Sequence, residues 1–201
     1  LSTDDLNALT GIQWAAMASD DLRGLTAAQW SQMDTADLRA LEPTQWAQMY
    51  TDDLNALTTA QWQAMDTGDL RGLTPAQWSK IDTQDLDALT AAQWSNMATD
   101  DLRGITADQW SAIGSSDLNA MSADQWSAMA SDDLRGIAAS AWGGVETADI
   151  VAITTAQWPR MASDDIAALD ATQWASMATD DLMSLTPQQW AVVPAANLRA
   201  M

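Results

Sequence analysis

The sequence predicts an all-α fold, an α-solenoid of sixteen-residue coils in which each coil contains two very short capped helices. The first observation is a period: the twelve tryptophans are spaced by sixteen residues, with no insertion or deletion. The second is that each period divides into two eight-residue segments with a similar pattern. The third is that residues typical of helix N-termini begin nearly every segment. Self-similarity at a short fixed period indicates a repeat architecture.

We name the two segments the Leu octad, for example STDDLNAL at 2–9, and the Trp octad, for example TGIQWAAM at 10–17. In both, a capping-type residue stands first, Asp or Gln fourth, Leu or Trp fifth, and mainly Leu, Met or Ile eighth. The two kinds alternate along the chain. About twelve sixteen-residue repeats are therefore expected to form a single array over residues 1–201. Leu1 stands in the eighth position of an octad, which suggests a fragment of a longer protein.

The Trp octads carry the clearest helix-start signal. In the octad TPAQWSKI, Thr74 can act as the N-cap, and Pro75 stands at the first helical position, where its missing N–H does no harm. Gln77, at the third helical position, completes a capping box with Thr74. Leu73, just before the cap, can pack on Trp78 at the fourth helical position as a hydrophobic staple. Each Trp octad is therefore predicted to begin a helix.

The Leu octads carry a weaker form of the same signal. In the octad DTADLRAL, Asp34 or Thr35 is the expected cap, and Asp37 lies in the first turn, where a negative charge suits the helix dipole. The seventh position of these octads is small, which is expected to let helices approach closely; it holds Ala8, Gly24, Ala40, Ala56 and Gly72. The seventh position of the Trp octads varies and is expected to face water; it holds Gln32, Gln48, Lys80, Asn96 and Arg160.

Helices of about six residues are unstable alone because nucleation is unfavourable, so neighbours must hold them. The predicted core consists of the fifth-position Leu and Trp side chains and the apolar eighth-position side chains. A β-solenoid is the alternative fold. Few residues are Val or Ile, and apolar residues recur at spacings of three and five rather than two. Both observations favour helices over strands.

The chain is strongly acidic, with 28 Asp and Glu against 8 Lys and Arg and a formal net charge of −20. Phosphate contacts require Lys and Arg, so no nucleic acid partner is expected. No apolar run approaches the roughly 18 residues of a membrane span, so no membrane insertion is expected. Histidine and cysteine are absent, which removes the commonest general base and any disulfide. We therefore expect neither an enzyme nor a cofactor.

The row of tryptophans has three interpretations, one of which is an electron-hopping chain. Aromatic platforms bind sugars, and a row of Trp rings at the rim of the array would suit a glycan. The simpler interpretation is that the rings fill the core, because such small coils contain few other large side chains. The regular partnership of Trp with the staple residue favours the core. Neighbouring helices lie about 8–10 Å apart, which would bring successive Trp side chains close without full stacking.

A row of aspartates recurs at the fourth position of the Leu octads and is often doubled at the third. Rows of carboxylates can bind calcium, which takes six to eight oxygen ligands. The candidate metal ligands are Asp20, Asp21, Asp52, Asp53, Asp100, Asp101, Asp132 and Asp133. No calcium-loop motif accompanies them, so first-turn acids that cap helices and keep the surface soluble are the favoured interpretation. Three arginines are expected to pair with the acid three residues before them: Arg23, Arg103 and Arg135.

The pattern breaks over residues 138–160. The octad AASAWGGV has Ala138 in place of the capping residue and Ala141 in place of Gln. Pro159 follows in the next Trp octad, where it would remove a helical hydrogen bond. We expect irregular coils here, and either a bend or the least protected part of the array. The last octad, PAANLRAM, also departs from the pattern with a Pro at the cap and an Asn in place of Asp.

The LTxxQ phrase of the Trp octads resembles the tandem LTTAQ-type repeats of very large bacterial surface proteins, which are labelled haem-utilisation or adhesion proteins. It occurs as LTGIQ, LTAAQ, LTTAQ, LTPAQ and LTPQQ, and the Trp after Gln and the alternation with TDDL depart from the plainest form. The resemblance implies a spacer or surface-display segment that is secreted or exposed on a bacterial cell surface. It implies no particular functional residue.

We therefore expect a non-enzymatic structural repeat segment, an extended rod on the order of 100 Å long if about twelve coils stack at helix spacing. Its partners would be the neighbouring domains of a longer, adhesin-like chain and a protein or glycan that the sequence does not identify. The alternative is a ligand-binding solenoid that uses the Asp row for calcium or exposed Trp rims for glycans.

Overall fold

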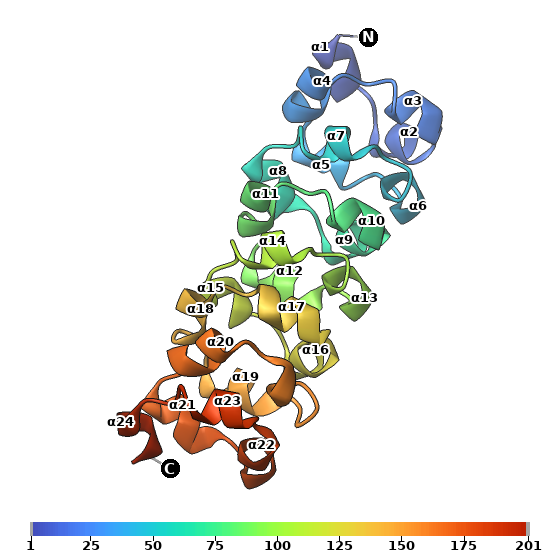
Figure 1. Cartoon of the computed structure of the whole chain (residues 1–201). Helices are drawn as coiled ribbons and strands as arrows, with labels where there is room; N and C mark the ends of the chain where they lie inside the picture. Colours follow the sequence, from blue (N-terminus) through green and yellow to red (C-terminus); the bar gives the residue numbers. More distant parts are fainter. Residues whose placement is uncertain (1, 200–201) are drawn as a thin grey trace. The chain divides into compact units, whose positions relative to one another are not determined.

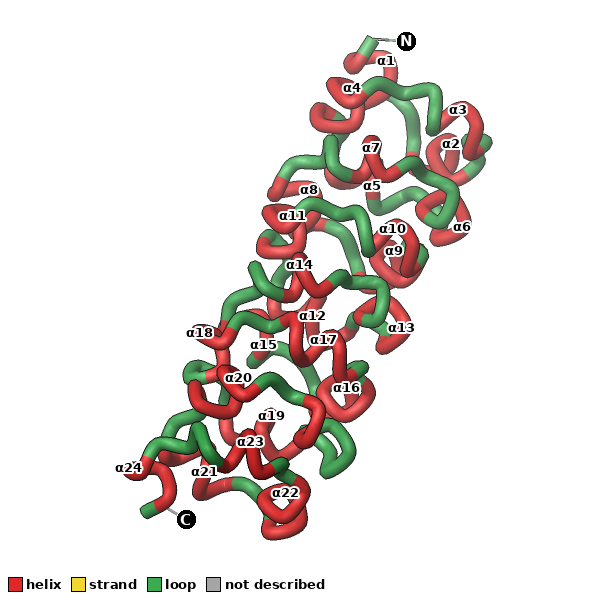
Figure 2. The backbone as a smooth tube through the Cα atoms, in the orientation of Figure 1, coloured by secondary structure: helices red, strands yellow, loops and turns green. Residues whose placement is uncertain are grey.

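The computed structural model describes residues 2–199, and within them every regular element is a helix and none is a strand (Figure 2). The chain forms two compact units, Leu1–Gly104 and Ile105–Met201, and each is described by itself. Both consist of very short helices joined by brief loops, which confirms the predicted α-solenoid and excludes a β-solenoid for the described residues.

Within the described residues 2–104, unit 1 contains helices α1 to α13, and their course can be followed in Figure 1. They are α1 (Thr3–Asn7), α2 (Gly11–Ala15), α3 (Ser19–Leu22), α4 (Ala27–Gln32), α5 (Thr35–Leu38), α6 (Pro43–Trp46), α7 (Thr51–Leu54), α8 (Thr59–Ala64), α9 (Thr67–Gly72), α10 (Pro75–Trp78), α11 (Thr83–Asp87), α12 (Ala91–Asn96) and α13 (Thr99–Leu102). One helix corresponds to each octad, as the two helices per sixteen residues predict.

Unit 2 continues the same pattern, with one 3₁₀ helix among its α-helices. They are α14 (Ala107–Trp110), α15 (Ser115–Leu118), α16 (Ala123–Ala128), α17 (Ser131–Gly136), α18 (Ala139–Trp142), α19 (Thr147–Ala152), η1 (Trp158–Arg160), α20 (Ser163–Ala168), α21 (Ala171–Ser176), α22 (Thr179–Ser184), α23 (Pro187–Trp190) and α24 (Ala195–Leu198).

The helices begin as the capping residues predict. At α10, the Gln77 backbone N–H donates to Thr74 Oγ1 at 3.3 Å, and the Thr74 backbone N–H donates to Gln77 Oε1 at 2.7 Å. This reciprocal pair is the capping box expected for the Trp octads. Leu73 and Trp78 are both buried, in agreement with the staple. In the Leu octads the signal is weaker, as expected: Asp34 is the N-cap of α5 but makes no side-chain cap bond.

A turn of the solenoid is longer than one sixteen-residue repeat. Within each unit the closest packing joins helices that are three elements apart along the chain, for example α6 to α9 and α14 to α17. Side-chain hydrogen bonds between successive turns join residues 28 and 31 apart, as from Gln45 to Met17 and Trp14. More than three octads therefore complete one turn, and a residue lies above a neighbour three to four octads away rather than two.

The core lies inside the winding helices and consists of the predicted positions. Every tryptophan from Trp14 to Trp174 has 0% of its surface exposed, and the apolar eighth-position residues from Met33 to Met177 are also buried. Ring centroids of Trp62 and Trp78 are 6.3 Å apart with planes tilted by 43°. Successive rings therefore meet at a tilt without stacking, as expected for core side chains.

Small seventh-position residues of the Leu octads allow turns to approach closely. A Cβ atom placed on Gly72 would lie 2.8 Å from Pro43 Cα, and one on Gly104 would lie 2.6 Å from the Pro75 carbonyl oxygen. Both contacts are too short for a side chain, so glycine is required by packing. The seventh position of the Trp octads is exposed at all five residues predicted to face water.

The stretch 138–160 is locally irregular. Helix α18 has Ala138 as its N-cap, with no side-chain cap bond, and Gly143 as its C-cap. Pro159 converts the following Trp octad from an α-helix into the 3₁₀ helix η1, because proline lacks the N–H that an α-helical bond needs at this position. The core nevertheless continues, since Trp142 and Trp158 are fully buried.

Candidate functional site

The fourth position of each octad lies between successive turns, and it carries most of the buried polar chemistry of the molecule. In the Trp octads this residue is glutamine. Its Oε1 atom accepts the N-cap N–H, while its Nε2 atom reaches the preceding turn. Gln77 Nε2 donates to the carbonyls of Trp46 and Met49, both at 2.9 Å. One side chain thus begins a helix and also ties that helix to the turn before it.

The same pair of amide bonds recurs along both units. In unit 1 it is formed by Gln45, Gln61, Gln77 and Gln93, and in unit 2 by Gln157, Gln173 and Gln189. All seven side chains are buried, and their bonds measure 2.6–3.0 Å. Buried polar groups that are fully bonded hold the turns in a unique register.

The Leu octads place an aspartate at the equivalent position. Its carboxylate can accept the N-cap N–H, as Asp69 Oδ2 does from Asp66 at 2.9 Å. Asp69 Oδ1 then accepts the indole N–H of Trp46 at 3.2 Å. A carboxylate cannot donate to carbonyls, so Asp69 ties its turn to an earlier one through the Trp46 indole N–H and not through a backbone oxygen. Asn197, the exception in the last octad, donates Nδ2 to the Leu169 carbonyl at 2.8 Å.

Burial raises the pKa of seven of the fourth-position aspartates. The effect is largest for Asp85, Asp101, Asp149 and Asp165, whose pKa values rise to about 6. The pKa values of Asp37, Asp53 and Asp69 are also raised by burial. A neighbouring acid adds to the effect at most of them, and Trp indole N–H groups oppose it. Asp37, Asp53 and Asp149 each have a buried Oδ2 atom with no hydrogen-bond partner, which adds to the cost of their ionised forms.

The burial of these aspartates corrects one expectation drawn from the sequence. The fourth-position acids were expected to keep the surface soluble, but most are buried between turns; they are Asp37, Asp53, Asp69, Asp85, Asp101, Asp149, Asp165 and Asp181. The expectation holds for the third-position acids, because Asp20, Asp52, Asp100 and Asp132 are exposed. The fourth octad position lies between successive turns, whereas the third octad position faces solvent.

Other side chains reach forward to the following turn. Asn55 Nδ2 donates to the Lys80 carbonyl at 3.0 Å, and Asn55 Oδ1 accepts the Asp82 N–H at 3.3 Å. Arg71, at the same sixth position of its octad, donates from Nε and Nη2 to the Asn96 carbonyl. Turns are therefore bonded from both sides, backward by the fourth position and forward by the sixth.

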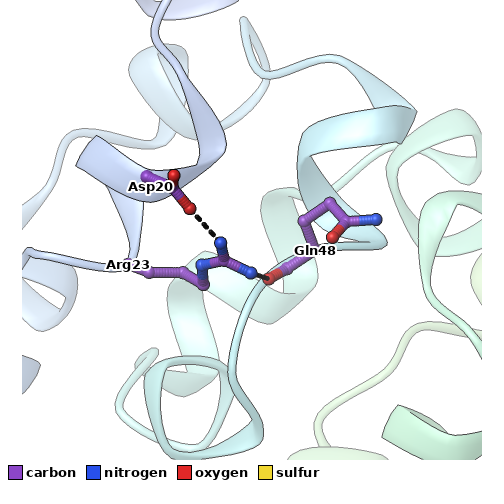
Figure 3. A network of polar contacts seen from close by, with 3 residues as sticks. All are labelled: Asp20, Arg23 and Gln48. Atoms are coloured by element: carbon purple, nitrogen blue, oxygen red, sulfur yellow. Dashed lines mark hydrogen bonds and ion pairs between the residues drawn. The ribbon is translucent and has the colours of Figure 1, made fainter.

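The predicted Asp–Arg pairs are confirmed. Arg23 pairs with Asp20, Arg103 with Asp100 at 2.9 Å, and Arg135 with Asp132 at 3.9 Å. Figure 3 shows Arg23 between Asp20 and the Gln48 carbonyl, to which it donates at 3.4 Å.

The candidate metal ligands do not gather. Across residues 2–199, no three His, Cys, Asp or Glu side chains are grouped so that they could hold a metal ion. Asp20, Asp100 and Asp132 face arginines, Asp53 and Asp101 are buried between turns, and Asp21 and Asp52 are exposed. Asp133 Oδ2 accepts the Ala130 N–H at 3.1 Å. One polar hollow of about 320 Å³ in unit 1 is lined by the carboxylates of Asp82 and Asp85. Its lining therefore includes two acidic side chains, fewer than the three that would form a metal-binding group.

The Trp rings are not available as sugar platforms. A platform needs an exposed aromatic face, and eleven of the rings have none. Trp190 alone is partly exposed. Exposed Trp rims, the aromatic part of the ligand-binding alternative, are therefore absent from Trp14 to Trp174.

The sequence reasoning missed the second role of the glutamines. A capping box needs only an acceptor at the third helical position, and Glu serves there as well as Gln. The chain nevertheless has Gln in eleven of its twelve Trp octads and Glu in none. This preference for an amide in an otherwise acidic chain was the available signal that a donor is required.

Two overlapping stretches, residues 31–67 and 63–99, match the model of the ALTTAQ repeat family. Both lie in unit 1, and each covers about two sixteen-residue repeats, so the expectation of a tandem repeat is confirmed there. No curated protein and no solved structure matches the chain. None of the helices within residues 2–199 is both long and apolar enough to pass through a bilayer.

Proposed function

We propose that the chain is a non-enzymatic structural repeat segment that serves as a spacer or display segment in a longer, adhesin-like bacterial surface protein. The observation that carries this proposal is the use of the polar side chains. The buried glutamines bond to backbone carbonyls of the preceding turn, and the Trp rings fill the core. These buried groups are occupied in holding turn to turn and in filling the core.

Repetition supports the same conclusion. A catalytic or binding site is usually a single constellation in a pocket. Here the same Gln–carbonyl bonds recur in both units, and a feature copied in this way favours an architectural role. The ALTTAQ match supports the repeat character of residues 31–99, and the placement on a bacterial surface rests on the resemblance of the LTxxQ phrase.

A spacer must hold its ends apart. Small-angle scattering of the whole chain tests this requirement, because it measures the radius of gyration. A globule of this length would have a radius of gyration of about 17 Å. We expect a clearly larger value and an asymmetric distance distribution. A radius of gyration at the globular value would contradict the spacer.

Titration followed by Trp fluorescence separates the proposal from a ligand-binding solenoid. Buried rings emit at short wavelength, and a structural segment should keep that spectrum and its melting temperature when calcium or soluble glycans are added. A saturable spectral change, or a melting temperature that rises with calcium concentration, would favour the ligand-binding alternative, because ligands stabilise the state they bind.

A further inference from the structure

We propose that a hollow in unit 1, where α7 and α8 meet α11, binds the protonated primary amine of a ligand through Asp82 and Asp85. The hollow has a volume of about 320 Å³, and polar residues such as Asn55 and Thr59 form most of its lining. Turns of the repeat precede and follow it along the chain. This inference adds a binding site to the proposed spacer and does not depend on the bacterial surface location.

Asp85 is a buried acid whose carboxylate lacks a hydrogen-bond partner. The residue is 8% exposed, and no hydrogen bond to its carboxylate is found among residues 2–199. The indole N–H of Trp62 lies near enough to lower the pKa of Asp85, but this N–H completes no hydrogen bond. An unpaired buried carboxylate is costly, because it has lost its hydration without gaining a donor. Asp85 lines the hollow, so a donor placed there could reach its carboxylate.

Asn55 explains why the Asp85 carboxylate is unpaired. In the Leu octad of α9, Asp69 Oδ2 accepts the N–H of the N-cap residue Asp66 at 2.9 Å. In α11 the N–H of the N-cap residue Asp82 donates instead to Asn55 Oδ1 at 3.3 Å. The Asp85 carboxylate is therefore left without the bond that Asp69 makes.

The same exchange of partners occurs in unit 2. Asn119 Oδ1 accepts the N–H of Glu146, the N-cap residue of α19, at 3.0 Å. The Oδ2 atom of Asp149 is then buried without a hydrogen-bond partner. An asparagine that accepts the N-cap N–H thus accompanies an unpaired carboxylate in both units. Asp149 Oδ2 is enclosed within the protein, whereas Asp85 lines the hollow, which makes Asp85 the better candidate for binding a ligand.

Asp82 supplies a second negative charge to the hollow. Its side chain is exposed and makes no cap bond in α11, unlike Asp66, whose Oδ1 accepts the Gly68 N–H at 2.8 Å. Burial, and then the nearby charge of Asp82, raise the pKa of Asp85 to about 6. At pH 7.5 the two carboxylates therefore face each other in their ionised forms. A cation between them would offset both their repulsion and the lost hydration of Asp85.

The chemistry of the hollow fits an ammonium group better than a metal ion. Calcium takes six to eight oxygen ligands, whereas two acids line this hollow. An ammonium group is a compact charge with three N–H donors, which two carboxylates and one neutral oxygen satisfy. Thr59 and Gln84 also line the hollow and carry neutral oxygens. Leu57 adds an apolar contact for the alkyl chain that bears the amine.

An NMR titration of the full chain with butylamine, which is protonated at pH 7.5, tests the proposal. The amide signals of Thr59, Asp82 and Asp85 and the indole N–H signal of Trp62 should shift and saturate. We expect a dissociation constant on the order of 1 mM, because one small site open to solvent supports only weak binding. Butanol has the same alkyl chain without the charge and should cause no saturable shift.

Two variants and one control locate the site. Asp85→Asn and Asp82→Asn should each raise the dissociation constant at least about tenfold, because each removes one of the two charges. Asp82→Asn keeps the test valid if Asp85→Asn disturbs the fold, since Asp82 is exposed and makes no cap bond. Asp52→Asn removes the same charge from an exposed acid outside the hollow and should leave the affinity unchanged. An unchanged affinity in Asp82→Asn, or an equal response to butanol, would overturn the proposal.

Two further probes identify the source of the amine. A capped lysine amide that binds more tightly than 1,4-diaminobutane would indicate a lysine side chain of a partner protein. The reverse order would indicate a free diamine. If none of the three amines produces saturable shifts at Asp82 and Asp85, the binding site is wrong, and the scattering test of the spacer is unaffected.

Discussion

Residues 58–97 and residues 138–160 have the same period but are held together differently. In the first stretch, Gln93 bonds to the carbonyls of Trp62 and Met65 at 2.7 and 2.9 Å, and Thr90 caps its helix. In the second, Ala141 stands where the glutamine would be, and α18 lacks a side-chain cap. Both stretches nevertheless bury their tryptophans completely.

The comparison separates two contributions to the fold. The apolar contribution is the same in both stretches, because Trp62 and Trp142 are equally buried. The polar contribution differs, because the irregular stretch has lost one capping box and one pair of amide bonds. In a repeat array each element is held mainly by its neighbours, so such losses are felt locally. The predictions that follow begin with the largest expected effect.

Emptying the core should destabilise both stretches equally. Trp62→Ala and Trp142→Ala should each lower the free energy of unfolding by roughly 3–5 kcal/mol, the usual cost of emptying a buried aromatic site. Urea denaturation of the two variants gives the values. A much smaller loss of unfolding free energy for Trp142→Ala would mean that the irregular stretch is loosely packed. That result would contradict the inference drawn from the equal burial of the two rings.

Removing one amide should make the regular stretch resemble the irregular one. Gln93→Ala loses two bonds to buried carbonyls and one to its N-cap, so we expect a loss of about 2–4 kcal/mol. Gln48→Ala is the matched control, since Gln48 is exposed, and it should lose well under about 0.5 kcal/mol. Equal melting of the two variants would show that the amide bonds contribute nothing.

Gln93→Glu distinguishes capping from donation. The carboxylate keeps the acceptor for the Thr90 N–H but places a negative charge against two carbonyls. At neutral pH this variant should therefore be no more stable than Gln93→Ala, although it retains a capping box. A variant as stable as the parent would contradict the role assigned to Nε2.

Stability should decrease as pH rises through the titration of the buried aspartates. Asp85 in unit 1 and Asp149 in unit 2 have folded-state pKa values of about 6, raised by burial from an ordinary 3.8. A raised carboxyl pKa means that the folded state binds more protons than the unfolded state between these two values. The stabilisation is complete below about pH 4 and is lost as pH approaches and passes 6, so the melting temperature should be lower at pH 7.5 than at pH 5.

Asp85→Asn sharpens the pH test. An asparagine keeps the size of the side chain and does not titrate, so the variant should lose part of the pH dependence and gain stability relative to the parent at neutral pH. Asp52→Asn is the control because Asp52 is exposed, and its melting curve should follow that of the parent across the pH range. A parent that is more stable at pH 7.5 than at pH 5 would contradict the burial argument.

Restoring one cap should strengthen the irregular stretch by the smallest amount. Ala138→Thr supplies the missing N-cap acceptor of α18 and should stabilise it by about 1 kcal/mol. Hydrogen exchange measures both the defect and its repair: amides of 138–160 should exchange faster than those of 58–97, and those of α18 should slow in the variant. Equal protection of the amides of the two stretches in the parent would contradict the prediction that 138–160 is the least stable part of the array.

Local features of the sequence predicted local structure well. The capping boxes and the surface Asp–Arg pairs depend on contacts within one helix or at its ends. Such contacts follow from spacing alone. The 3₁₀ form of η1 follows in the same way from Pro159. The single-array organisation over residues 1–201 and the surface location remain predictions.

The sequence by itself determined where each helix begins and which side chains form the core, because caps and apolar spacing act within a few residues. Only the tertiary structure decided how many octads complete a turn, and therefore what the fourth position contacts. The number of octads in a turn depends on the angle between successive short helices. Small backbone rotations in each loop set this angle, and their effect accumulates along the chain. Since residues 28 and 31 apart meet only after that accumulation, neither the Gln–carbonyl bonds nor the burial of the aspartates could be read from the period.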